Sequence, residues 1–254
     1  MKPNILVIAG HDPSGGAGIH ADIEAVHSLG GFASTLITAL TVQNSRNVSG
    51  FQLTPIDLLE QQADALLADY EFQAVKIGMT GSVEMVEWIA RLLARLPGVP
   101  VVLDPVLAAE AGGSLARGDL AEVMLTRLAP LTTVLTPNLP EAELLAGRQG
   151  VTESGTAITG RCGRAVLVTG THDDTDQVSN HLFDGDRRRH WDWPRLPHVY
   201  HGSGCSLASA MACRLARGDD LDSAAETAQR WLHQALRDAW RPGGGQHVPD
   251  RRPL

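Results

Sequence analysis

The sequence predicts an α/β fold in which a mainly parallel central sheet carries helices on both faces. Short apolar runs such as Asn4–Ala9 (NILVIA) are typical of strands buried on both faces, as in parallel sheets. Segments with apolar residues at helical spacing separate these runs, and this alternation implies parallel strands joined by crossover helices. The chain has 254 residues, 43% of them hydrophobic, which is enough for one large core. We therefore expect a single domain over residues 1–242 and a loop-like C-terminal tail over residues 243–254.

Six apolar runs are predicted as strands of the parallel sheet. They are Asn4–Ala9, Phe32–Leu40, Ala74–Ile77, Val99–Leu103, Thr132–Leu135 and Ala165–Val168. Two further segments, Val178–Phe183 and Arg188–Trp193, flank the turn sequence DGD, which is typical of an antiparallel hairpin. We place this hairpin at the edge of the sheet.

The helices are predicted from apolar residues that recur every three or four positions. They are Ile19–Leu29, Pro55–Asp69, Val83–Leu96, Leu115–Leu128, a short helix near Pro140, Cys205–Arg217 and Leu221–Trp240. Pro140 suits the first turn of a helix, where its missing N–H would have no partner. The stretch 148–163 is short and Gly-rich, and no element is assigned to it.

Charge and cysteine content exclude several classes of protein. A formal net charge of −8 argues against a general nucleic-acid-binding protein, whose surface would be basic. The three cysteines, Cys162, Cys205 and Cys213, lack the spacing of a zinc site or a disulfide framework. The apolar start is too short for a signal peptide, and no run approaches the roughly 18 apolar residues of a membrane span. We therefore expect a cytoplasmic protein.

Several chemically useful residues directly follow predicted strands. They are Gly10, Gln43, Met79, Asp104 and Asn138. Ligands of parallel α/β sheets bind beyond the carboxyl ends of the strands. We therefore expect these residues to lie along one rim, together with a Gly-rich turn late in the chain.

That turn contains Gly202, Ser203 and Gly204 and precedes an Ala-rich segment of high helix propensity. The free N–H groups and positive dipole of a helix N-terminus favour an oxyanion or a phosphate. Cys205 lies where the turn meets the helix, so we expect its pKa to be lowered. A plain turn with a packed cysteine is the alternative.

Two nucleotide-binding motifs almost match the first glycine-rich loop. Gly10–Gly15 (GHDPSG) has P-loop spacing, but a Gly-Ala pair follows where Lys and Ser or Thr would bind phosphate and magnesium. Gly16–Ala21 (GAGIHA) fits the dinucleotide pattern, but it begins well beyond the strand, and Gln43 stands where an acidic residue would bind the ribose. These mismatches argue against a dehydrogenase.

The motifs GHDPSGGAGIHAD, KIGM, TPNLPEA and HGSGC occur in this order along nearly the whole chain. Together they resemble the hydroxymethylpyrimidine/phosphomethylpyrimidine kinases of thiamin biosynthesis, in the ribokinase-like superfamily. KIGM and TPNLPEA by themselves also fit pyridoxal kinases. The resemblance implies a three-layer α-β-α ribokinase-like fold, a homodimer, and the use of ATP and Mg²⁺.

The implied activity is ATP-dependent phosphorylation of the hydroxymethyl group of 4-amino-5-hydroxymethyl-2-methylpyrimidine, followed by phosphorylation of the monophosphate to the diphosphate. The alternatives are a pyridoxal/pyridoxine kinase and a non-catalytic ligand-binding protein on the same scaffold. The resemblance makes Cys205 the general base for the hydroxyl proton. Gly202, Ser203 and Gly204 would offer N–H groups to the transferred phosphoryl group.

The resemblance also assigns the substrate pocket. Gln43 occupies the position of the family's substrate-binding glutamine, and its amide can both donate to and accept from an aminopyrimidine edge. Gly10 and Asp22 would lie near the same substrate, while Met79 and Val106 would supply apolar walls for the ring. The alternatives are a loop-capping amide for Gln43, a charge favoured by the helix dipole for Asp22, and core packing for the two apolar residues.

The nucleotide site follows from the N-x-x-E motif of Asn138 and Glu141, which in the superfamily organises magnesium and the ATP phosphates. Mg²⁺ keeps several waters, so Glu141 with help from Asp104 is chemically sufficient, although Asn138 could simply cap a helix. Thr169 and Gly170 would lie near the phosphates or the adenosine. Many family members have Lys-Gly-Gly where this chain has Thr-Gly-Thr from residue 169, and Thr is frequent where Pro105 stands.

Overall fold

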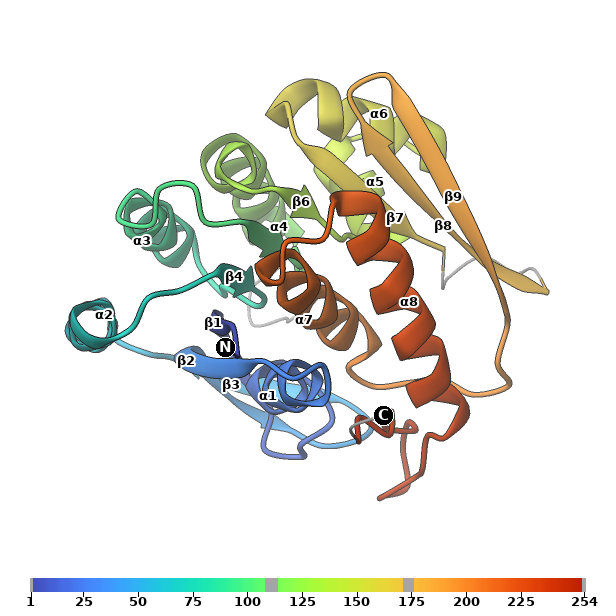
Figure 1. Ribbon diagram of the computed structural model, residues 1–254, viewed down its shortest axis with the longest axis horizontal. Coiled ribbons are helices and arrows are strands. Elements are labelled where there is room, and N and C mark those ends of the chain that lie inside the picture. The colour runs from blue at the N-terminus through green and yellow to red at the C-terminus, as the bar shows by residue number, and fades with distance from the viewer. Residues whose placement is uncertain (1, 108–113, 171–175, 253–254) are drawn as a thin grey trace.

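The computed structural model describes residues 2–107, 114–170 and 176–252. Within this part, nine strands form one sheet in the order β3-β2-β1-β4-β5-β6-β7-β8-β9 (Figure 1). The strands are β1 (Asn4–His11), β2 (Phe32–Gln43), β3 (Val48–Leu53), β4 (Ala74–Ile77), β5 (Val101–Leu103), β6 (Val134–Leu135), β7 (Ala165–Thr169), β8 (Gln177–Asp184) and β9 (Arg187–Pro194). The six strands from β2 across to β7 are parallel, and the expected β8–β9 hairpin is antiparallel at the edge.

The opposite edge differs from the prediction. β3 pairs antiparallel with β2, from Ala39 opposite Leu53 to Gln43 opposite Val48. Its sequence, VSGFQL, contains no continuous apolar run, which is why the sequence pattern gave no strand there. Because β2 pairs with β3 along this length, β2 continues through Gln43, and this residue ends a strand instead of lying in a loop.

Helices cover both faces of the sheet. They are α1 (Gly18–Ser28), α2 (Ile56–Asp69), α3 (Val83–Leu93), α4 (Ser114–Val123), α5 (Leu139–Ala146), α6 (Val151–Cys162), α7 (Ser203–Ala216) and α8 (Leu221–Arg237). A π-turn (Met124–Leu128) and a 3-10 turn (Ala129–Leu131) follow α4. The three-layer α/β architecture is confirmed.

Helix α6 lies in the Gly-rich stretch to which no element was assigned. One of its glycines serves packing: a Cβ at Gly155 would lie 2.4 Å from the Phe183 ring, so only glycine lets α6 approach β8 this closely. Glycine has a low intrinsic helix propensity, but the close contact between α6 and Phe183 of β8 requires a residue without a Cβ.

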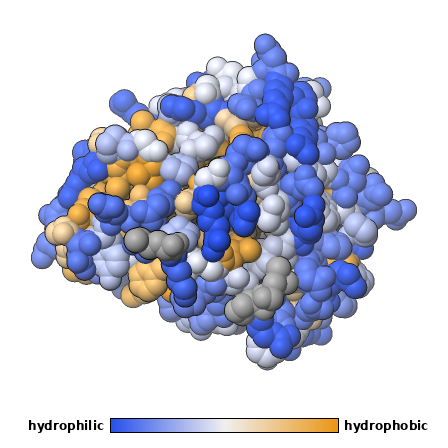
Figure 2. Space-filling model, viewed as in Figure 1, coloured by the Kyte–Doolittle hydropathy of each residue, from blue (hydrophilic) through white to orange (hydrophobic). Residues whose placement is uncertain are grey.

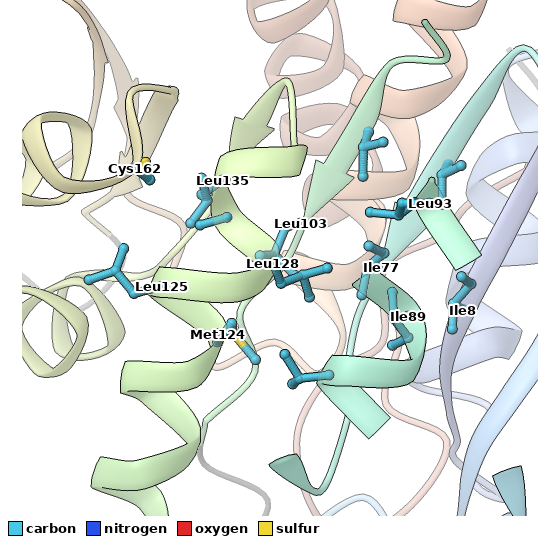
Figure 3. Close-up of a cluster of buried hydrophobic side chains, with 14 of the residues drawn as sticks. Ile8, Ile77, Ile89, Leu93, Leu103, Met124, Leu125, Leu128, Leu135 and Cys162 are labelled. Carbon is cyan, nitrogen blue, oxygen red and sulfur yellow. The ribbon is translucent and has the colours of Figure 1, made fainter. Parts of the chain in front are cut away.

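Successive side chains along a strand point to opposite faces of the sheet, so the sheet has a hydrophobic core on each face. One core joins the sheet to α2–α6 and includes Ile8, Ile77, Leu103 and Leu135 from neighbouring strands (Figure 3). The other joins the opposite face to α1, α7 and α8. The outer surface is mostly hydrophilic in the view of Figure 2, with apolar areas on the side of α2 and α3.

Among the described residues, no helix combines the length and the apolar character that crossing a bilayer requires.

The C-terminal segment carries no helix or strand but is held against the domain. It turns back from the end of α8 toward α1 (Figure 1). Backbone bonds join Val248 to Trp240 in both directions, and His201 N–H donates to the His247 carbonyl at 2.8 Å. As far as residue 252, the tail is therefore an ordered loop and not a disordered extension.

Candidate active site

An open cavity of about 180 Å³ lies beyond the carboxyl ends of the parallel strands. Five segments of the chain line the cavity. Three of them lie at the carboxyl ends of β5, β6 and β7, and the other two are the glycine-rich loop after β1 and the start of α7. The lining residues are Ala17, Asp104, Val106, Thr136, Asn138, Glu141, Thr169, Gly202, Ser203, Gly204 and Cys205. Of the residues expected along the rim, Asp104 and Asn138 line this cavity together with the turn before α7, whereas Gly10, Gln43 and Met79 do not.

The turn at the start of α7 has the geometry of an anion site. Gly202 is the N-cap with φ 77°, and no side chain caps the helix, so the first N–H groups of α7 are left for a ligand. A Cβ at Gly202 would lie 2.0 Å from the Gly16 carbonyl oxygen, which shows how closely the two glycine-rich loops approach each other. Glycine is required here both for the positive φ and for this contact.

Asp12 organises the first of these loops. Its Oδ1 accepts hydrogen bonds from Ser14 N at 2.8 Å and Ser14 Oγ at 2.7 Å, and its Oδ2 accepts from Ala17 N at 2.9 Å. His201 Nε2 lies 2.8 Å from the same Oδ2. Burial by itself raises the pKa of Asp12, but the hydrogen bonds from His201 and Ser14 outweigh it and lower the pKa to about 2.

His201 connects the two loops to Gln43. Its Nε2 lies 2.9 Å from the Gln43 side-chain amide as well as 2.8 Å from Asp12. Gln43 is half-buried at the end of β2, with Thr41 Oγ1 3.3 Å from its Oε1. The predicted substrate amide therefore lies against a histidine to which the sequence assigned no role.

The Cys205 thiol differs from the prediction. Burial raises its pKa to about 12, and the carboxylates of Asp104 and Asp22 act in the same direction. Lys76 and a hydrogen bond from the Gly18 N–H oppose this rise without overcoming it. The expected lowering of the pKa was wrong because it considered only the helix N-terminus and neither burial nor the two acidic neighbours. The thiol keeps its proton at neutral pH and donates it in a hydrogen bond to Asp104.

Asp22 does not line the cavity. Its side chain is fully buried and receives hydrogen bonds from Lys76 Nζ and Ser209 Oγ, both at 2.7 Å. Lys76 is also fully buried, because alternation along β4 turns it toward α1 and α7. This ion pair places a fixed positive charge behind Cys205 and Asp104, and Asp22 in turn raises the pKa of Lys76 against the effect of burial.

Two carboxylates face the cavity from adjacent strand ends. Burial raises the pKa of Asp104 to about 6, with Asp22 adding to the rise and Lys76 opposing it. Burial and repulsion by Asp104 raise the pKa of Glu141 to about 8. Two buried carboxylates that disfavour each other's ionisation form a donor set suited to Mg²⁺, which takes few protein carboxylates and keeps several waters. Within the described residues, no group of three or more His, Cys, Asp or Glu could hold a metal ion.

Asn138 and Glu141 also form a complete capping box for α5. The Asn138 side chain accepts from Glu141 N at 2.9 Å, and Glu141 Oε2 accepts from Asn138 N at 3.0 Å. The helix-capping alternative is therefore realised in the structure. It does not remove Glu141 from the cavity, which both residues line.

The part of the cavity formed by the end of β7 is supported from behind by hydrogen bonds. Thr169 lines the cavity, and the next residue, Gly170, donates its N–H to Asn180 Oδ1 at 3.1 Å. Asn180 in turn donates to Gln229 of α8 at 2.8 Å. Residue 171, the last of the Thr-Gly-Thr sequence, lies outside the described residues.

The remaining predicted residues are divided between the cavity and its surroundings. Val106 lines the cavity, whereas Gly10 and Met79 are not lining residues and pack against each other, with a Cβ at Gly10 meeting Met79 Sδ at 3.0 Å. Sequence reasoning missed Asp12, His201 and Lys76. A lysine within an otherwise apolar buried strand is itself a signal, because lysine is almost never buried without a partner.

Comparison with known families and proteins agrees with this geometry. A family model described as phosphomethylpyrimidine kinase matches residues 12–250. The hydroxymethylpyrimidine/phosphomethylpyrimidine kinase of Streptomyces coelicolor is 37% identical over 249 residues, which cover 96% of this chain and 92% of that protein. The multifunctional ThiED protein of Corynebacterium efficiens is 38% identical over 259 residues. The chain spans 35% of that protein and 52% of the bifunctional ThiED of Geobacter sulfurreducens.

Solved structures share the fold over most of the chain. The ADP complex of Bacillus subtilis pyridoxal kinase has a TM-score of 0.91 at 25% identity, covering 99% of this chain and 98% of that one. The phosphomethylpyrimidine kinase of Clostridium difficile has a TM-score of 0.79 at 30% identity, covering 92% of this chain and 100% of that one.

Proposed function

The chain belongs to the phosphomethylpyrimidine kinase family, and from this premise we propose that it transfers the γ-phosphoryl group of ATP to 4-amino-5-hydroxymethyl-2-methylpyrimidine in thiamin biosynthesis. A second transfer converts the monophosphate to the diphosphate. The observation that carries the proposal is the cavity in which an uncapped helix N-terminus, two carboxylates and a cysteine meet. The homodimer and the cytoplasmic location stay predictions.

The turn at Gly202–Gly204 binds the transferred phosphoryl group. Phosphoryl transfer demands little covalent chemistry from the protein, so positioning and stabilisation of charge account for most of the catalysis. N–H groups that are already oriented can meet the developing negative charge without reorganisation. Gln43, whose side-chain amide lies 2.9 Å from His201 Nε2, would bind the edge of the pyrimidine ring.

The first transfer requires a base because a hydroxymethyl group is neutral at pH 7. The hydroxyl oxygen attacks the γ-phosphorus, the bond to ADP breaks, and Cys205 takes the hydroxyl proton. In the protein alone, burial and the neighbouring carboxylates keep a proton on this thiol. Cys205 can therefore accept the hydroxyl proton only as a thiolate, after its own proton has left to solvent. A reduced field of the neighbouring carboxylates would favour that ionisation, which burial opposes.

Asp104 and Glu141 are the residues that would hold Mg²⁺. When bound, the ion would neutralise charge on the phosphates and on these two carboxylates. Lys76 already supplies one positive charge on the opposite side of Cys205. Asp104, the one carboxylate of this pair that also raises the pKa of Cys205, thus links the ionisation of the base to the loaded nucleotide site.

Purified protein tests the proposal directly. With ATP and the hydroxymethylpyrimidine, we expect ADP release and a phosphorylated product detectable by mass spectrometry. Comparison of kcat/KM with pyridoxal is needed, because the pyridoxal kinase of Bacillus subtilis has the higher TM-score, 0.91 against 0.79. A clear preference for pyridoxal would overturn the proposed substrate, and no ADP release with either compound would favour a non-catalytic binding protein.

A further inference from the structure

Arg251 is a buried cation in the C-terminal segment, and it touches both glycine-rich loops. Its side chain is 1% exposed. Nη2 donates to the Gly16 carbonyl at 2.6 Å, Nε donates to Ser206 Oγ at 2.7 Å, and Nη1 donates to Glu24 Oε2 at 3.0 Å. Ser206 Oγ continues the connection by donating to the Gly202 carbonyl at 2.7 Å.

One guanidinium thus holds the carbonyls of Gly16 and Gly202, the second through a hydroxyl group. These are the two residues at which the loops come closest, since a Cβ at Gly202 would lie 2.0 Å from the Gly16 oxygen and 2.8 Å from Arg251 Nη2. The neighbouring residues Ala17 and Ser203 line the cavity, whereas Arg251 does not. Arg251 therefore reaches the site from behind its backbone and makes no contact with the space for ligands.

The segment that carries Arg251 is itself fixed by backbone bonds on both sides. Asp250 N–H donates to the Ala235 carbonyl of α8 at 2.9 Å, and the Ser28 hydroxyl of α1 donates to the Arg252 carbonyl at 3.1 Å. A terminal segment is ordered only when it is tied down in this way. These bonds hold the Arg251 backbone in one position. The side chain therefore loses less conformational entropy when the guanidinium binds the two loops.

Burying a guanidinium is costly unless its donors are satisfied, so an arginine at this place needs a specific reason. The half-exposed Glu24 carboxylate accounts for one of the three bonds, and the other two go to the Gly16 carbonyl and to Ser206 in the first turn of α7. A lysine could not replace this arrangement, because only the planar guanidinium presents several donors in fixed directions. The family model ends at residue 250, so the family match does not include this residue.

We propose that Arg251 is a positioning residue for phosphoryl transfer, which locks the Gly16 and Gly202 carbonyls so that the N–H groups of both loops point into the cavity. The proposal rests on the proposed function. It implies that loss of Arg251 affects the chemical step more than binding of the pyrimidine, because Gln43 and His201 contact each other and Asp12, whereas Arg251 bonds to Gly16, Ser206 and Glu24.

Arg251→Ala is compared with Arg252→Ala, which removes the adjacent arginine, a side chain that is 82% exposed and pairs with Asp250. We expect kcat of Arg251→Ala to fall at least about tenfold, with KM for the pyrimidine changed less than about threefold. Arg252→Ala should keep both constants. Added guanidinium at low millimolar concentration should restore part of kcat in Arg251→Ala alone. Arg251→Lys should remain impaired, and this variant serves the test if Arg251→Ala does not fold.

Amide hydrogen exchange supplies a readout that needs no activity. In Arg251→Ala or Arg251→Lys, the amides of residues 15–18 and 202–206 should exchange faster, and those of the central strands should not. If the wild type phosphorylates neither heterocycle, the proposed function fails while the exchange data still test Arg251. A wild-type kcat in Arg251→Lys, a loss confined to KM, or unchanged exchange in both loops would overturn the proposal.

Discussion

Substitution of Gly202 by alanine is the sharpest test of the contact between the two glycine-rich loops. A Cβ there would lie 2.0 Å from the Gly16 carbonyl oxygen and 2.9 Å from Ala17 Cα. Because real Cβ atoms essentially never come within 3.0 Å of another heavy atom, the loops must separate by about 1 Å. A displacement of about 1 Å in positioning groups costs on the order of a hundredfold in rate. We expect kcat of Gly202→Ala to fall by about that factor.

Gly218, just beyond the other end of α7, is the matched control. Its φ is +89°, against +77° at Gly202, so alanine is strained by its backbone at both positions. At Gly218, however, an added Cβ would meet nothing within 4 Å. Alanine in this backbone conformation lowers the free energy of unfolding by about 1–2 kcal/mol at each position. Overpacking lowers it by about 1–3 kcal/mol more at Gly202 alone.

Urea unfolding followed by tryptophan fluorescence measures the two stabilities, and steady-state kinetics measures kcat. Gly218→Ala should lose only the backbone term and keep wild-type kcat. The reasoning is refuted if both variants lose the same stability and Gly202→Ala retains kcat within about twofold, because the loops would then not be in contact.

Three further predictions concern single side chains. Cys205→Ala should slow the first phosphorylation about a hundredfold or more and the second far less, because a phosphate monoester with a second pKa near 6 is already ionised; equal losses in single-turnover assays would show that Cys205 positions the phosphate. Since the pKa of Asp12 is about 2 and not the ordinary 3.8, its interactions stabilise the fold above pH 4 and are lost between pH 4 and 2. Asp12→Asn should therefore lose up to about 2 kcal/mol at pH 7 and show a flatter acid limb in urea titrations; an unchanged acid limb would contradict the pairing with His201. Glu141→Gln should raise the Mg²⁺ concentration needed for half-maximal activity at least about tenfold, and a wild-type requirement would place the ion elsewhere.

The sequence predicted most of the sheet because buried parallel strands have a pattern that does not depend on distant neighbours. Apolar runs identified β1, β4, β5 and β7, and the DGD turn identified the β8–β9 hairpin. β3 and α6 escaped detection for the opposite reason. The first is held by pairing with β2, and the second contains Gly155, which is required by its contact with Phe183.

The sequence also predicted which residues gather at the strand ends, since the rule that parallel strands end at one edge depends on topology alone. Asp104, Asn138, Glu141, Thr169 and the turn before α7 all line one cavity. The hydrogen-bond and ion-pair partners of these residues could be identified only from the tertiary structure.

By itself, then, the sequence determined the fold class, the location of the site and the chemical groups available there. The tertiary structure decided their electrostatics and support: the Asp22–Lys76 pair, the contact of His201 with Asp12, and the approach of Arg251 to both loops. The sign of the Cys205 pKa shift shows why. A helix N-terminus is visible in the sequence, but burial and neighbouring carboxylates depend on where distant segments meet, and here they outweigh it.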